Sequence, residues 1–133
     1  MTSLVIDIPN LHDGSLTGLD FASDRVTARM TDWTGKPYVL EMRGVERFHV
    51  AVESNNLIGW LEIIQGKRPR KRLLRRLFGT PNPRWPDYFQ SEVEDEAERA
   101  DRIVSGEAAL VVLHGNFTVF FVGLCESAIL TDG

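Results

Sequence analysis

Apolar and polar side chains alternate along much of the chain, most clearly between residues 38 and 64. Residues 38–42 place apolar side chains at every second position, and residues 48–52 repeat the pattern after the turn-forming pair Arg43-Gly44. Successive side chains of a strand point to opposite faces, so this period of two indicates antiparallel strands with one face on a core. We therefore predict that a β-sheet organises the fold.

Runs of the same kind flank this block. We predict strands upstream at residues 4–8, 16–21 and 25–31, and downstream at residues 107–113, 117–122 and 124–130. Residues 32–35 and 114–116 have the length and composition of hairpin connections. Residues 109–113 are apolar on both faces, which is typical of a central strand covered from both sides.

Residues 57–64 fit two structures. Their apolar positions also have helical spacing, and Asn55 or Asn56 could cap a helix. Gly59 weakens a helix, however, the run is short, and its neighbours are predicted strands. We therefore favour a strand and expect Trp60 to belong to the core.

The middle of the chain departs from the strand pattern. Residues 67–76 carry seven basic side chains and no acid, and a helix at about residues 69–78 gathers leucines on one side and cations on the other. Pro69 suits a first helical position, and Gly79 followed by Pro81 is a stop signal. We predict a short basic amphipathic helix that lies outside the core as an accessory.

A second helix is predicted at about residues 92–104. Ser91 and Glu94 have the spacing of a capping box, and apolar residues recur from Val93 at intervals of four, three and four. The outer face of this helix is acidic, and Gly106 ends it.

Together these elements predict an α+β fold that is mainly antiparallel β, with about eight or nine strands in a curved sheet or a sandwich. A length of 133 residues favours one domain with a sizeable core. We expect residues 1–133 to form that domain, with a helical insertion, first basic and then acidic, at about residues 66–105.

Composition narrows the function classes only slightly. The net charge of −4 gives no overall attraction to nucleic acid or membranes. Cys125 is the sole cysteine, which excludes an intramolecular disulfide and an all-cysteine metal site. The N-terminus lacks the features of a signal peptide, and no segment has the length of a membrane span, so we expect a cytoplasmic protein.

The basic run is the most conspicuous candidate for a function. Its cations could hold a phosphate backbone while neighbouring aromatics stack on bases, or could lie on an anionic membrane surface. They could also contact an acidic protein partner, with Trp85 as an aromatic anchor. A structural interpretation competes with these functions, because the next helix is acidic and the two charged segments could neutralise each other.

The histidines and the cysteine give weaker indications. His12 and Asp13 in a turn could form one corner of a metal or enzymatic site that His49 or His114 completes, but no recognisable ligand spacing is present. We favour ordinary roles, with one hydrogen-bonded turn histidine and two histidines on strand surfaces. Cys125 and His114 have the composition of a nucleophile and base, although a lone cysteine in an apolar strand is more often an inert core residue.

Short stretches of the chain carry a resemblance to known proteins. They are Leu-His-Asp-Gly-Ser-Leu at 11–16, a strand containing Val26, Leu-Glu-Met-Arg-Gly-Val at 40–45, and Asn-Leu-Ile at 56–58. In this order they are similar to small bacterial β-rich proteins of uncharacterised families, some grouped with immunity proteins of polymorphic toxin systems. The resemblance covers roughly residues 10–64 and the last β-strands and implies a non-enzymatic binding protein. It transfers no site residues, and residues 67–84 depart from it.

We therefore predict a non-catalytic, immunity-like cytoplasmic module that binds a protein partner and uses no cofactor. The residues expected to contact the partner are Arg70, Arg72, Arg75, Arg76, Arg84 and Trp85. One alternative is nucleic-acid binding through residues 67–84. A second is an enzyme or metal site around His12 and Asp13.

Overall fold

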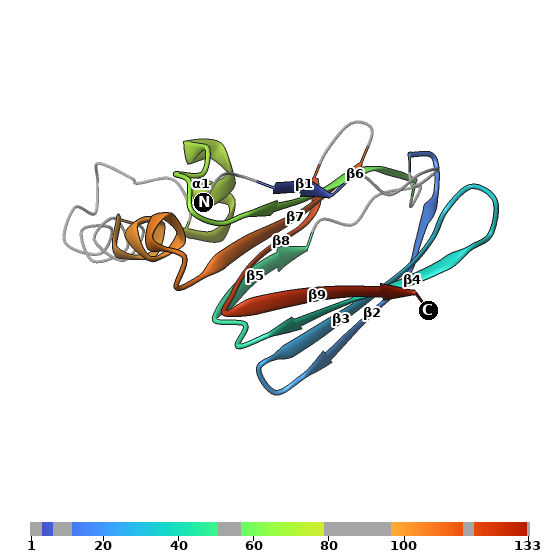
Figure 1. The fold of residues 1–133 in the computed structure, drawn as a ribbon, viewed down its shortest axis with the longest axis horizontal. Coiled ribbons are helices and arrows are strands. Elements are labelled where there is room, and N and C mark those ends of the chain that lie inside the picture. Colours follow the sequence, from blue (N-terminus) through green and yellow to red (C-terminus); the bar gives the residue numbers. More distant parts are fainter. Residues whose placement is uncertain (1–3, 7–11, 51–56, 79–96, 116–118, 133) are drawn as a thin grey trace, which may run out of the picture.

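The computed structural model describes residues 4–6, 12–50, 57–78, 97–115 and 119–132. Within these ranges the chain forms two antiparallel sheets, with two helices packed against one of them (Figure 1). The prediction of a mainly antiparallel α+β fold is confirmed. The strands form two separate sheets, which corrects the alternative of one curved sheet.

One sheet has five strands in the order β1-β6-β7-β8-β5, and the other has four in the order β2-β3-β4-β9. The five-stranded sheet consists of β1 (Leu4–Ile6), β5 (Arg47–Val50), β6 (Ile58–Ile64), β7 (Ala109–Gly115) and β8 (Val119–Cys125). The four-stranded sheet consists of β2 (Ser15–Ala22), β3 (Arg25–Thr31), β4 (Pro37–Arg43) and β9 (Ser127–Asp132). The ambiguous segment at residues 57–64 therefore forms a strand, as predicted.

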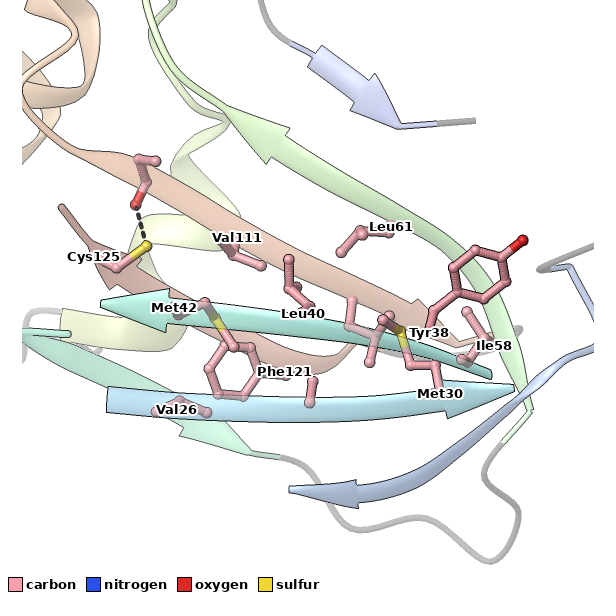
Figure 2. Close-up of a cluster of buried hydrophobic side chains, with 13 residues drawn as sticks. Val26, Met30, Tyr38, Leu40, Met42, Ile58, Leu61, Val111, Phe121 and Cys125 are labelled. Carbon is pink, nitrogen blue, oxygen red and sulfur yellow. Dashed lines mark hydrogen bonds between the residues drawn. The ribbon is translucent and has the colours of Figure 1, made fainter. Parts of the chain in front are cut away.

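The main core fills the space between the two sheets, where alternate side chains of facing strands meet (Figure 2). Its buried members are Val26, Ala28, Met30, Tyr38, Leu40, Met42, Ile58, Leu61, Ala109, Val111, Leu113, Phe121 and Cys125. Full burial of one large aliphatic or aromatic side chain stabilises the fold by about 1.5–3 kcal/mol. The apolar residues that alternate along 38–42 are the side chains by which β4 packs on this core.

A second core covers the opposite face of the five-stranded sheet. Strand β7 is buried along its whole length, as predicted for a central strand, so its outward side chains also need a cover. Helix α1 (Lys71–Phe78) and the helix at residues 97–105 provide that cover. The buried members of this cluster are Ile64, Leu73, Leu74, Leu77, Ala100, Ile103, Ala108, Leu110, Val112, Val122 and Leu124.

The leucines of α1 correct one prediction. Leu73, Leu74 and Leu77 are only 0%, 3% and 6% exposed, so the basic segment is a wall of the second core and is not an accessory outside the fold. The sequence pattern showed the leucine stripe but not the sheet face that receives it. The helix begins at Lys71 rather than at Pro69, because the carbonyl of Arg70 accepts the first helical N–H bonds.

The helix at residues 97–105 ends where the sequence predicts. Gly106 has a φ of 88°, its N–H donates to the carbonyl of Ile103, and the N–H of Glu107 donates to that of Arg102. This pair of bonds is the Schellman motif, which needs a left-handed residue after the helix. The predicted start of this helix, at residues 92–96, lies outside the described residues. No helix within the described ranges is long and apolar enough to cross a membrane.

Candidate functional site

The site begins with a β-bulge in β6. The register between β6 and β7 shifts between Ile58 and Trp60, which leaves Gly59 as the extra residue. Side chains two positions apart normally share a face, so an unbroken strand would send Trp60 into the main core behind Ile58. Instead Ile58 is fully buried and Trp60 is 47% exposed on the outer face. The expectation that Trp60 belongs to the core is therefore wrong, and the bulge is the reason.

The backbone at the bulge packs closely around Gly59. A Cβ on Gly59 would lie 3.0 Å from the carbonyl oxygen of Gly115. The carbonyl of Gly59 accepts a hydrogen bond of 3.2 Å from Nδ1–H of His12. Asp13, with a φ of 66°, donates its N–H to the carbonyl of Ile58. The His12–Asp13 turn thus holds the bulge in place.

A buried polar cluster lies next to Trp60 on the same face. The Glu62 side chain is 7% exposed, and its Oε1 lies 2.9 Å from Nη2 of Arg70 and 3.1 Å from Nε2 of His114. The carboxylate paired with the guanidinium only accepts, so Nε2 of His114 carries a proton and donates. His114 is 5% exposed, which overturns the expectation of a strand-surface position. His49, in contrast, is exposed on β5 as predicted.

Burial determines the charge of His114. Its pKa is lowered mainly by burial, and the positive charges of Arg70 and Arg72 lower it further, while the hydrogen bond to Glu62 opposes the shift. His114 is therefore neutral near pH 7. Its near-complete burial makes His114 part of the packing that joins β6, β7 and the residue before α1.

Trp60 lies flat on His114. The two residues are directly opposite in the pairing of β6 with β7, and their rings stack with centroids 4.0 Å apart and an interplanar angle of 17°. Such a cross-strand stack fixes the orientation of both rings. One face of the indole is thus held against the protein, and much of the remaining ring surface is exposed.

Helix α1 presents its cations on the side that faces away from the second core. Lys71, Arg72, Arg75 and Arg76 are all exposed, and no acid among the described residues lies within ion-pair distance of any of them. We call these four residues the basic face of α1. Arg70, predicted as a contact, is instead partly engaged with Glu62, while its side chain remains 49% exposed. Arg84 and Trp85 lie outside the described residues.

The acidic helix neutralises little of this charge in the described part of the chain. Arg68 alone of residues 67–76 approaches an acid of the helix at residues 97–105, at 3.9 Å from Asp101, and both side chains are largely exposed. An exposed pair of this kind contributes only about 0–1 kcal/mol. Two arginines of that helix, Arg99 and Arg102, both form ion pairs with Glu46. Among the residues that the structure describes, the exposed acids of this helix therefore do not neutralise the basic face of α1.

The alternative with Cys125 as a nucleophile does not match the geometry. Cys125 is buried in the main core, and its thiol donates to the carbonyl of Ala109 at 3.7 Å (Figure 2). Burial raises its pKa to about 12, so the reactive thiolate is not formed at neutral pH. His114 lies on the opposite face of the sheet, away from the thiol.

The remaining alternative placed an enzyme or metal site at His12 and Asp13. The two side chains are 70% and 60% exposed, and Nε2 of His12 lies 3.8 Å from Oδ1 of Asp13. Across the described ranges, no group of three His, Cys, Asp or Glu side chains could hold a metal ion. Comparison with known proteins found no matching family model, no matching curated protein and no matching solved structure.

Proposed function

We propose that this chain is a non-catalytic, cytoplasmic protein-binding module that docks an acidic region of its partner on the basic face of α1. The observation that carries the proposal is the exposure of four cations without acidic partners among the described residues, on a helix whose other side is buried. Cations placed in this way steer an acidic surface during association and fix its register.

The helix is rigidly mounted, which favours a binding role. Leu73, Leu74 and Leu77 seat it on β8 and β5, and Arg70 ties its start to Glu62. A preorganised helix loses little conformational freedom when a partner arrives, so more of the interaction energy appears as affinity.

The neighbouring acids favour a protein over a nucleic acid. Glu98 and Asp101 are 65% and 80% exposed on the helix that shares the second core with α1. Together with the net charge of −4, they repel a continuous polyanion. A protein surface of mixed charge can complement both signs. Residues 10–64 and the last β-strands also resemble small bacterial β-rich proteins of uncharacterised families, some grouped with immunity proteins of polymorphic toxin systems. On this basis we propose that the partner is a toxin and that binding is the whole activity.

Two matched charge variants test the proposal. One replaces Arg72, Arg75 and Arg76 with Gln; the control replaces Arg25, Arg29 and Arg43, which pair with surface acids of the four-stranded sheet. Both variants remove the same number of positive charges, so an effect of net charge alone is equal in the two.

Each protein is used as bait in an extract of the native host, and its binding to a single-stranded oligonucleotide is titrated against salt. The proposal predicts that one protein is retained by the native chain and the control variant but lost from the α1 variant. Retention by all three, or recovery of no partner, contradicts it. Oligonucleotide binding that weakens steeply with salt and requires α1 would favour the nucleic-acid alternative instead.

A further inference from the structure

We infer that Trp60 is the apolar anchor of the same interface, and that the partner presents an acidic segment with a large apolar side chain beside its carboxylates. This inference rests on the proposed function and specifies the chemistry of the partner. The stacked geometry of the indole carries it, independently of the charge on α1.

A short chain of contacts links Trp60 to the residue that precedes α1. The contacts run from the Trp60 ring to the His114 ring, from His114 Nε2 to Glu62 Oε1 at 3.1 Å, and from that oxygen to Arg70 Nη2 at 2.9 Å. Arg70 immediately precedes α1. His114 and Glu62 are buried, so the indole and the half-exposed Arg70 are the two exposed ends of this chain of contacts.

The exposure of Trp60 is built into the strand. Gly59 creates the bulge that turns the side chain outward, and His114 supports one face of the ring from the next strand. Trp60 shields His114 with one face of its ring, but this role does not explain why 47% of Trp60 remains exposed. A fixed, half-exposed indole loses little side-chain entropy when an apolar group covers it.

The combination of residues matches the centre of a protein interface. Tryptophan and arginine are the side chains most enriched among residues that dominate binding energy. Here Trp60 offers apolar area, while Arg70, half-exposed, and Arg72, exposed, lie beside the same cluster. A partner segment with a carboxylate next to a leucine or an aromatic side chain pairs with these arginines and covers the indole at the same time.

Two synthetic peptides test this chemistry. One repeats Glu-Glu-Leu and the other repeats Glu-Glu-Ser, so they share charge and differ in apolar content. Their binding is measured by fluorescence anisotropy of a labelled peptide. In a variant with Trp33→Phe and Trp85→Phe, which leaves Trp60 as the sole tryptophan, the emission of Trp60 reports directly on its cover.

We expect the leucine peptide to bind about tenfold more tightly and to shift the emission of Trp60, because the leucine is removed from water against the indole. Trp60→Ser should abolish the difference between the peptides while salt-sensitive binding of both persists. Trp60→Phe should restore part of it, with thermal unfolding confirming that each variant is folded.

The outcomes separate the two proposals. Equal affinity of both peptides for the native chain, or a leucine advantage that survives Trp60→Ser, overturns the role of Trp60 and leaves the basic face of α1 standing. If neither peptide binds, and replacing Arg72, Arg75 and Arg76 also leaves capture of the host partner unchanged, both proposals are overturned.

Discussion

Arg70 and Glu62 join the start of α1 to β6, with Nη2 of the arginine 2.9 Å from Oε1 of a glutamate that is 7% exposed. A buried carboxylate is tolerated only when donors compensate its lost hydration. His114 supplies the other donor seen at this oxygen. Arg70 therefore has a structural role as the ion-pair partner of Glu62, and it differs in this from the exposed cations of α1.

Replacing Arg70 should destabilise the protein more than replacing another arginine of the segment. Arg70→Ala leaves Glu62 buried with one donor fewer, and we expect a loss of about 1–3 kcal/mol, moderated by the exposure of the arginine. Arg76→Ala is the matched control and should change stability by about 0.5 kcal/mol or less. Urea unfolding of both variants measures the difference. Equal losses would show that the pair does not anchor α1.

Acid should destabilise the fold through His114. Burial lowers the pKa of this histidine below its ordinary value of 6.5, so the unfolded chain takes up the proton more readily than the folded one. The free energy of unfolding should therefore fall as the pH drops below about 6.5, down to the folded-state pKa.

Unfolding by urea at a series of pH values checks this, with His114→Phe as the comparison, since phenylalanine retains a ring beneath Trp60 without titrating. The native chain should lose more stability on acidification than the variant does. Parallel pH profiles for the two proteins would rule out a lowered pKa of His114 as the cause.

A side chain at Gly59 should destabilise the bulge. A methyl group there would approach the carbonyl oxygen of Gly115 to 3.0 Å, and we expect Gly59→Ala to cost about 1–3 kcal/mol and to alter the emission of Trp60. Gly18 in β2 is the control, because it also borders a register shift but has no atom within 4 Å of the place that a methyl group would take. Gly18→Ala should be close to neutral. If both variants behave alike, close packing at the bulge does not direct Trp60 outward.

The thiol of Cys125 should be inert in the folded protein. Its pKa of about 12 and its burial predict negligible reaction with a thiol reagent at neutral pH, and full reaction after denaturation in guanidinium. Rapid labelling of the native chain would contradict both the burial and the exclusion of a cysteine nucleophile.

The strands were predictable because each needs only its own alternation. Residues 38–42 show which side chains of β4 face the core, and residues 109–113 show that β7 is covered on both sides, without knowledge of any other segment. Gly106 likewise marks a helix end through its own left-handed conformation. These are local properties of the chain.

The site depended on relationships between distant segments. Trp60 faces outward because one inserted residue reverses the phase of β6, and only Gly59 hinted at such an irregularity. His114 is buried because Trp60 stacks on it and Glu62 and Arg70 close around it. No pattern within β7 shows this cover. The leucines of α1 similarly revealed an apolar stripe, but not the face of the sheet against which it packs.

Chemical footprinting of two lysines tests most directly whether a partner covers the basic face of α1. Lys71 belongs to that face, and Lys36 lies in the turn between β3 and β4 of the other sheet; both are exposed. Acetylation is compared for the free chain and for its complex with the partner recovered from the host. We expect Lys71 to be protected in the complex while Lys36 reacts as before. Unchanged labelling of Lys71, or protection of Lys36 alone, would contradict it.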